Sequence, residues 1–143
     1  MRRATELNPN NQWNIADMGF VLGYLGEPAQ ALAWMQRARE VDPFFDPPWY
    51  YRMTGLILLN LHRYEEALAI LEQAPGPQYR NSVFAAACLA RLGRMDEARA
   101  AAAKVLELKP DYTIGRQIAK EPLRNPEDAA HLAESLRMAG LPE

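Results

Sequence analysis

The chain of 143 residues is 49% apolar and 24% charged, a composition typical of one folded domain, which excludes an intrinsically disordered protein. Its 16 Lys and Arg residues against 18 Asp and Glu give a formal net charge of −2, so the chain lacks the strongly basic balance of a general nucleic-acid binder. A single cysteine, Cys88, excludes an intramolecular disulfide and a cysteine-based zinc site, and no apolar run approaches the roughly 18–20 residues of a membrane-spanning helix.

Residues 12–45 are predicted to form a first pair of helices. Apolar residues recur there at i, i+3, i+4 and i+7, the spacing of one face of an α-helix, and β-type alternation is absent. The pattern predicts helices over 12–25 and 28–41, joined by a short turn.

Two further copies of this pattern follow, in residues 48–78 and 79–112. Their predicted helices are 48–61, 64–74, 79–92 and 95–108. Asp46 is expected to cap the first of these helices. In every copy a small residue of the first helix faces a small residue of the second, which lets the two helix axes approach closely. The pairs are Gly19 with Ala31, Gly55 with Ala67, and Ala86 with Ala98.

A single pair cannot bury both of its apolar faces, so the pairs must stack. We therefore predict an all-α fold, a right-handed α-solenoid of three helical hairpins with a concave inner face. Residues 113–143 are expected to close the open face of the third hairpin, with a short helix over 113–120 and a terminal capping helix that Asn125 caps. The apolar stripe of the terminal helix consists of Ala129, Leu132, Ala133 and Leu136.

The repeated residues resemble the tetratricopeptide repeat (TPR) family. The resemblance covers residues 12–110, and in the first copy it is carried by Ile15, Met18-Gly19, Leu22, Ala31, Met35, Ala38 and Pro43. It implies a solenoid that binds other proteins. Ala4 and Pro9 match the end of a preceding repeat, so we expect residues 1–11 to belong to such a repeat and the chain to be cut from a longer protein.

The ending of the chain resembles the C-terminal TPR regions of bacterial class III adenylate/guanylate cyclases. This resemblance is carried by the runs 106–114, 120–122 and 126–128 and by the ending 136–143. It implies a regulatory part of a larger bacterial signalling protein. Similar repeats also accompany winged-helix transcription regulators, and this alternative stays open.

Residues with catalytic chemistry are few and lie apart. His62 and His131 have no serine or cysteine partner at a motif spacing, and we expect both to face solvent in a turn and on the terminal helix. Cys88 lies in an alanine-rich helix and is expected to pack as a small apolar residue. No Walker A, GxGxxG or HExxH pattern occurs. We therefore expect no enzyme activity, no cofactor and no metal.

In the TPR pattern the first helix of each hairpin lines the concave groove. Carried over residue by residue, the resemblance assigns eleven residues of this chain to partner binding: Trp13, Asp17, Phe20, Tyr24, Trp49, Arg52, Met53, Leu56, Arg80, Phe84 and Arg91. Ala16 and Phe20 stand where chaperone-binding members hold a carboxylate with Lys and Asn, so that clamp is not expected. In a second interpretation, Trp13, Trp49 and Phe84 only pack against each other or the cap.

Two functions follow from this interpretation. The chain binds a protein, either a peptide or a helix, in its concave groove; alternatively it is an intramolecular regulatory or dimerisation element whose groove its own parent protein fills. We expect no nucleic-acid binding and no membrane insertion, a homodimer as one possible state, and a cytoplasmic location that is compatible with a membrane-attached parent.

Overall fold

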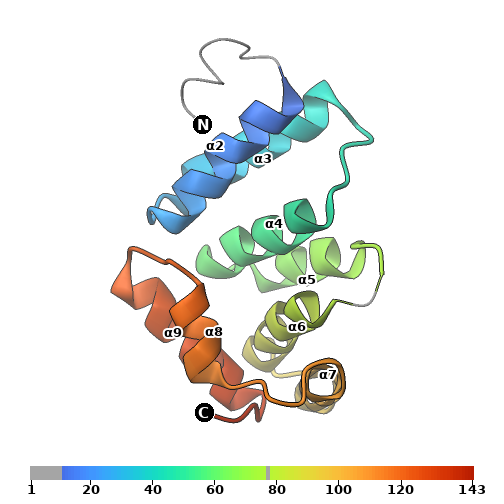
Figure 1. Cartoon of the computed structure of the whole chain (residues 1–143), viewed down its shortest axis with the longest axis vertical. Coiled ribbons are helices and arrows are strands. Elements are labelled where there is room, and N and C mark those ends of the chain that lie inside the picture. The colour runs from blue at the N-terminus through green and yellow to red at the C-terminus, as the bar shows by residue number, and fades with distance from the viewer. Residues whose placement is uncertain (1–10, 77) are drawn as a thin grey trace.

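The computed structural model describes residues 11–76 and 78–143 (Figure 1). Within these residues it contains eight α-helices and no strand, which confirms the predicted all-α fold class. The helices are α2 (Gln12–Tyr24), α3 (Pro28–Val41), α4 (Pro48–Asn60), α5 (Tyr64–Glu72), α6 (Tyr79–Arg91), α7 (Met95–Leu108), α8 (Ile114–Lys120) and α9 (Pro126–Met138). The proposed end of a preceding repeat lies almost wholly in residues 1–10, outside the described part.

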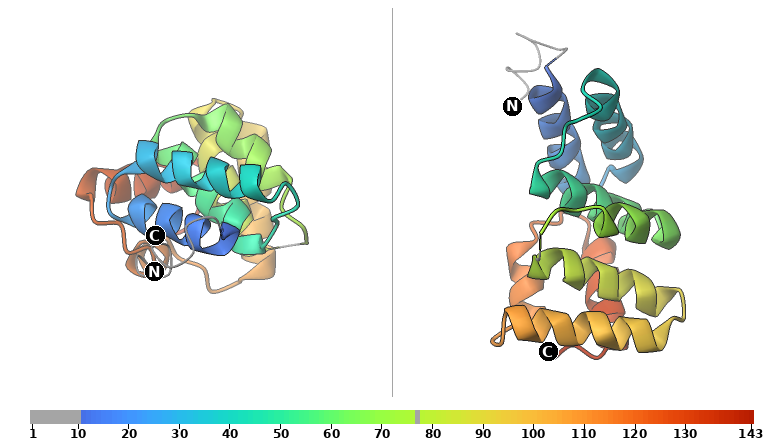
Figure 2. Two further views of the ribbon diagram at one scale, coloured as in Figure 1. Left: turned by 90° about the horizontal axis from the view of Figure 1, so that it is seen from above. Right: turned by 90° about the vertical axis from the view of Figure 1, so that its right-hand side faces the viewer.

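Three helical hairpins, α2–α3, α4–α5 and α6–α7, follow one another along the long axis of the molecule (Figures 1 and 2). The first helix of each hairpin contacts the first helix of the next, so that α4 packs on both α2 and α6. The second helices, α3 and α5, contact the first helix of the next hairpin and not one another. The first helices therefore line one continuous side of the solenoid, which we call the inner face.

The small residues predicted at the helix contacts explain how closely each hairpin is packed. A Cβ added to Gly19 would lie 3.0 Å from the backbone oxygen of Ala31, and one added to Gly55 would lie 2.5 Å from Leu71 Cδ2. Ala31 and Ala67 are completely buried. The predicted pairing of first and second helices is thus confirmed.

The second hairpin departs from the other two in its turn and in its length. The turns of the first and third hairpins hold Gly26 and Gly93 at φ +82° and +77°, but the second turn holds His62 at φ +60°. Its second helix, α5, has nine residues, whereas α3 and α7 have 14 each. Pro75 follows closely, and proline lacks the N–H that a longer helix would need.

The caps agree in part with the predictions. Asn125 caps α9 as expected, because its side chain accepts a hydrogen bond from the backbone N–H of Glu127. Asp46 does not cap α4, which begins at Pro48 as predicted but follows Pro47 and has no side-chain cap. Pro47 occupies the cap position instead, and its side chain has no oxygen that could accept from the N–H groups of the first turn.

The C-terminal segment 113–143 turns back along the inner face. Helix α9 packs on α6 and reaches α4, and α8 packs on α9 (Figure 1). Among the described helices, α9 makes no contact with α7. Its stripe is buried as predicted, with Leu132 and Leu136 both completely inaccessible. The segment therefore closes the third hairpin from its inner side, and it also covers part of the second.

Candidate functional site

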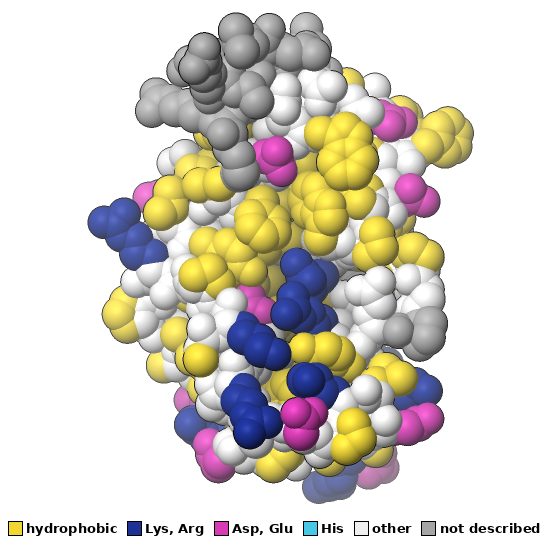
Figure 3. Space-filling model, in the orientation of Figure 1, with side chains coloured by type: hydrophobic (Ala, Val, Ile, Leu, Met, Phe, Trp, Pro, Cys, Tyr) yellow, Lys and Arg dark blue, Asp and Glu magenta, His cyan; other side chains and the backbone are white. Residues whose placement is uncertain are grey.

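The inner face has an open half formed by the first hairpin and the start of the second. Four aromatic residues meet there, Trp13, Phe20, Phe45 and Trp49, which we call the aromatic cluster. The ring centroids of Trp13 and Phe45 are 4.9 Å apart, those of Phe20 and Trp49 5.9 Å, and those of Trp13 and Trp49 6.0 Å. Trp13 is 48% exposed, and hydrophobic side chains spread over this half of the face (Figure 3).

Two features border the aromatic cluster. Asp17 lies on α2 and is half-buried, and this burial raises the pKa of its carboxyl above the usual value. A hollow of about 440 Å³ also opens beside Trp13, with Phe44 and Phe45 in its lining. Phe44 is 88% exposed. Apolar surface that reaches water this extensively is typical of a contact site.

The other half of the predicted groove is closed. Met53, Leu56 and Phe84 were predicted to touch a partner, but each is only 1% exposed. Met53 packs under Gly23 of α2, and α9 covers the helices that carry Leu56 and Phe84. These three residues are core, so their assignment to partner binding was wrong: Met53 lies under α2, and α9 lies over the helices of the other two.

Arg91 was also predicted to face a partner, and it instead holds α9 in place. Its Nε donates a hydrogen bond of 2.7 Å to Ser135 Oγ, and its Nη2 donates one of 3.4 Å to the backbone oxygen of His131. Its Nη2 also lies 4.0 Å from the carboxylate of Glu134. The guanidinium of Arg91 therefore makes its polar contacts within the chain.

Tyr24 connects the first hairpin to the C-terminal segment. Its hydroxyl donates a hydrogen bond of 2.8 Å to the carboxylate of Glu121, and its backbone oxygen accepts one of 2.8 Å from the N–H of Arg124. Burial and then the charge of Glu121 raise the pKa of the Tyr24 hydroxyl. The phenol therefore keeps its proton and acts as a donor.

The middle of the inner face is basic (Figure 3). The charges of Arg52 and Arg80 both act on the Tyr24 hydroxyl. Arg80 Nε donates to the hydroxyl of Tyr79 at 3.4 Å, and Lys109 Nζ lies 5.6 Å from the centroid of the Tyr79 ring. Burial raises the pKa of Tyr79, but the Arg80 hydrogen bond and the charges of Arg80, Lys120 and Lys109 outweigh it and lower that pKa. Cations from four parts of the chain thus gather around two tyrosines.

Two histidines that the sequence placed in solvent meet at the contact between α9 and the second turn. The rings of His62 and His131 are stacked, and the Tyr64 hydroxyl lies 2.8 Å from His131 Nε2. His62 is exposed as expected, whereas His131 is half-buried. Burial, followed by the charges of Arg91 and His62, lowers the pKa of His131 to about 4. No pattern in the sequence connects these residues, because they meet only through the docking of α9.

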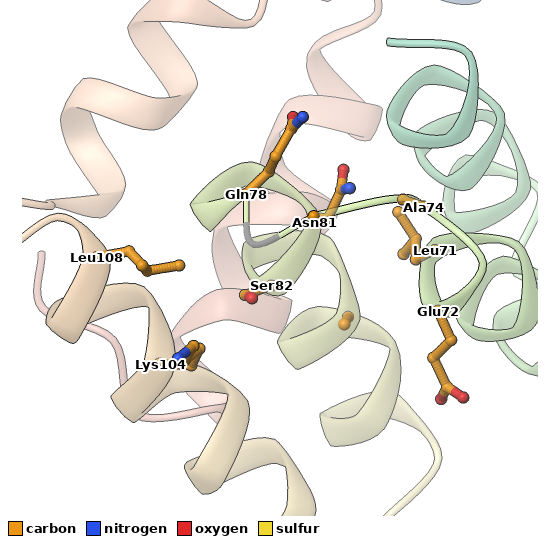
Figure 4. A pocket seen from close by; sticks show the side chains of 10 residues that line it. Leu71, Glu72, Ala74, Gln78, Asn81, Ser82, Lys104 and Leu108 are labelled. Atoms are coloured by element: carbon orange, nitrogen blue, oxygen red, sulfur yellow. The ribbon is translucent and has the colours of Figure 1, made fainter. Parts of the chain in front are cut away.

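A second hollow, of about 240 Å³, lies away from the aromatic cluster, where the short α5 leaves a gap beside α6 and α7 (Figure 4). Leu71 and Ala74 line one side, and Lys104 and Leu108 line the other. Asn81 and Ser82 lie between them on α6. Among the described lining residues there is no histidine or cysteine, and the ionisable side chains are those of Glu72 and Lys104.

The described residues present no reactive thiol and no group of metal ligands. Cys88 is completely buried, and burial raises the pKa of its thiol to about 12, so it is protonated at neutral pH and shielded from substrates. Over residues 11–76 and 78–143 no three His, Cys, Asp or Glu side chains gather as metal ligands. In the same part of the chain, no helix has the length and hydrophobicity needed to cross a membrane.

The comparisons with known proteins agree with the fold. Residues 82–112 match the model of the tetratricopeptide repeat family. A structure described as the MamA RS-1 ArsTM double mutant is 17% identical over 96% of this chain and 80% of that one, with a TM-score of 0.70. MamA 41-end from Desulfovibrio magneticus RS-1 is 18% identical over 94% of this chain and 78% of that one, with a TM-score of 0.69.

A third structure is YrrB, described as a TPR protein with an unusual peptide-binding site, which is 18% identical over 97% of this chain and 91% of that one at a TM-score of 0.45. No curated protein matches the chain. The arrangement of hairpins and the likeness to MamA lead to one conclusion. The chain has the fold of a TPR solenoid, and within it residues 82–112 match the tetratricopeptide repeat family itself.

Proposed function

We propose that this chain is a protein-binding module whose partner docks on the open half of the inner face. The observation that carries the proposal is the aromatic cluster, in which Trp13 is 48% exposed and packs on Trp49. Large aromatic side chains in a rigid setting are the usual anchors of protein interfaces, because they bury much surface at a small cost in conformational entropy. The TPR fold supports an interaction module in general.

The proposed contact residues are those predicted residues that remain accessible. Trp13, Phe20 and Trp49 provide apolar contact, while Asp17 and Arg52 offer polar contacts at the border. A partner peptide or a partner helix fits this description, because both can lay apolar side chains along an aromatic surface.

A selection of displayed random peptides tests this proposal without a known partner. Peptides of about twelve residues would be selected on the immobilised chain, synthesised, and measured by fluorescence anisotropy. Trp13→Ala should weaken the selected peptides by about fivefold or more, as expected for an anchor residue. Trp34→Ala is the matched control, because Trp34 is a half-buried tryptophan on α3, outside the inner face.

The proposal fails if the selected peptides bind the Trp13→Ala chain at full strength. It also fails if Trp34→Ala weakens them as much as Trp13→Ala does. Thermal unfolding of both variants separates a lost contact from a lost fold, because Trp13 is 48% exposed and a chain without it should still unfold in one cooperative transition.

A second candidate function has its own supporting observation. The chain already fills half of its inner face with residues 113–143, which is what an intramolecular regulatory element does. A homodimer in which the aromatic clusters of two copies meet belongs to the same class. Sedimentation velocity at several concentrations tests the dimer: a constant monomer mass contradicts it, and a Trp13-dependent rise in mass supports it.

We also propose that the module is a regulatory part of a larger bacterial signalling protein, such as an adenylate or guanylate cyclase. The support is the resemblance of the ending of the chain, including the run 126–128. A cyclase or winged-helix domain in the reading frame upstream of Met1 would support the proposal, and an upstream stop codon would contradict it.

A further inference from the structure

The partner's chemistry can be inferred from the charges beside the aromatic cluster, an inference that rests on the proposed function. Phe20 of the cluster packs on Tyr24 with ring centroids 5.1 Å apart. Lys and Arg side chains gather in the middle of this face (Figure 3), and the charges of Arg52 and Arg80 lower the pKa of the Tyr24 hydroxyl against the larger effects of burial and Glu121. A partner segment bound along the aromatic cluster would therefore extend past Tyr24 toward these two cations.

The basic region is built from separate parts of the fold. Arg52 comes from α4, three residues after Trp49, and Arg80 comes from the start of α6. Lys120 ends α8 and acts, with Arg80, on the Tyr79 hydroxyl. We name Arg52, Arg80 and Lys120 the cation cluster. It is complete only when the C-terminal segment is docked, because Lys120 belongs to that segment.

The cation cluster is short of negative charge. In the described part of the chain, no carboxylate lies within 4.0 Å of the charged groups of Arg52, Arg80 or Lys120. By contrast, most other basic residues of the third hairpin and the C-terminal segment are paired, for example Lys109 and Arg116 with Asp111. Arg52 and Arg80 are half-buried and Lys120 is exposed, so all three can reach a ligand.

One carboxylate of the chain itself shows what this region accepts. Glu121 is only 6% exposed, and it accepts hydrogen bonds from the Tyr24 hydroxyl at 2.8 Å and from Gln117 Nε2 at 2.7 Å. Its charge also acts on Arg80. One negative charge buried next to three cations leaves the region with net positive charge. A further carboxylate would be stabilised there by charges that are partly withdrawn from water.

We propose that the partner of the inner face is an acidic peptide, with apolar side chains on the aromatic cluster and adjacent Asp or Glu side chains on Arg52, Arg80 and Lys120. The site is composite: two cations come from the hairpins and one from the C-terminal segment. A nucleic acid suits the chain less well, because with a net charge of −2 the chain lacks the strongly basic balance of a general nucleic-acid binder.

The peptide selection tests the proposal when the displayed peptides are sequenced. We expect Asp and Glu to be enriched next to apolar residues, and we expect binding to weaken as salt is raised. Arg52→Glu and Arg80→Glu should each weaken a selected acidic peptide by about tenfold, and Lys120→Glu by less, since it is more exposed. Arg37→Glu is the control, because it makes the same charge change at an exposed position of α3.

Three outcomes would overturn the proposal. In the first, the selected peptides depend on Trp13 but show no acidic enrichment; in the second, they bind the Arg52→Glu and Arg80→Glu chains at full strength. Both leave the proposed function intact. In the third, single-stranded oligothymidylate displaces the acidic peptide at equal or lower concentration, which assigns the cluster to nucleic acid. Arg52→Gln and Arg80→Gln, with unchanged melting temperatures, replace the glutamate variants if those fail to fold.

Failure of the proposed function gives a different result. If no selected peptide depends on Trp13, the aromatic cluster is not a docking surface, and the acidic-peptide proposal falls with it. The dependence on Trp13 and the dependence on Arg52 are therefore measured on the same peptides and scored separately.

Discussion

The imidazole ring of His62 lies flat on that of His131, with ring centroids 4.3 Å apart and an angle of 10° between the planes. His62 adopts this position at φ +60°, in the turn position that the other two hairpins fill with Gly26 and Gly93. A residue with a Cβ is disfavoured in this left-handed region by roughly 1–2 kcal/mol. We expect the stacked ring to offset part of that cost while α9 stays docked.

A double-mutant cycle checks this coupling. In a chain that carries His131→Ala, the further change His62→Gly should raise the free energy of unfolding by about 1 kcal/mol, because the strained turn is relieved and no stack remains to lose. In the parent chain the same change should gain less, since it also removes an aromatic contact worth about 0.5–1.5 kcal/mol. Urea unfolding of the four chains measures the difference. Equal effects of His62→Gly in both backgrounds would show that the stack contributes nothing.

The pKa of His131 predicts a loss of stability in acid. The folded state holds this pKa at about 4, and the unfolded state has the ordinary value of 6.5. Between these values the unfolded chain binds the proton and the folded chain does not, so the free energy of unfolding falls as the pH is lowered from 6.5 toward 4. The difference between the parent chain and His131→Gln, measured by urea unfolding across this interval, isolates the effect. The free energy of unfolding should fall more steeply with decreasing pH in the parent chain than in the His131→Gln chain. Parallel curves for the two chains would contradict the lowered pKa of His131.

Alanine substitutions at Gly55 and Gly115 should have opposite effects on stability, because only Gly55 lies at the close contact of α4 and α5. Gly55→Ala should lower the free energy of unfolding by about 1–3 kcal/mol, because the new Cβ meets Leu71 at 2.5 Å. Gly115→Ala is the matched control in α8: nothing lies within 4 Å of its added Cβ, and alanine favours a helix over glycine by up to about 1 kcal/mol. Thermal and urea unfolding compare the two. A Gly55→Ala chain as stable as the parent would contradict the close packing.

Cys88 reports whether the C-terminal segment covers the inner face. In the full chain it is completely buried with a pKa raised to about 12, so a thiol-specific reagent should label it only after unfolding. Deleting residues 122–143 removes α9 from α6, the helix that carries Cys88. We expect rapid labelling and self-association of the shortened chain, because apolar surface becomes exposed. A shortened chain that stays monomeric, unlabelled and unchanged in melting midpoint would show that the segment is not a cover.

The hairpins could be predicted from the sequence because their contacts are local. The two helices of each hairpin follow one another directly along the chain, and the structure confirms their contact, with Gly19 against Ala31 as predicted and Gly55 against Leu71. The docking of α9 could not be predicted in this way. The stripe of Leu132 and Leu136 shows that one face of the helix is buried, but it does not show which surface covers it.

The difference between local and distant contacts also explains which residues of the candidate site could be predicted. Trp13 and Arg52 lie on the side of their helices that the repeat pattern assigns to the groove. Trp13 is exposed and Arg52 is half-buried. Leu56 and Phe84 follow the same pattern, but they are buried. A repeat pattern identifies the side of a helix on which a residue lies. Whether that side meets solvent depends on contacts between residues distant in the sequence.

The hydrogen bond from Tyr24 to Glu121 joins residues 97 positions apart. A simple solenoid has contacts only between neighbouring repeats, so its ends fray and its repeats can unfold one by one. Here the last segment of the chain is tied to the first hairpin, and the amide hydrogens of α2 should exchange with solvent almost as slowly as those of α6. We therefore expect the two ends of this stack to unfold together, and we expect folding to be slower because of this long loop closure.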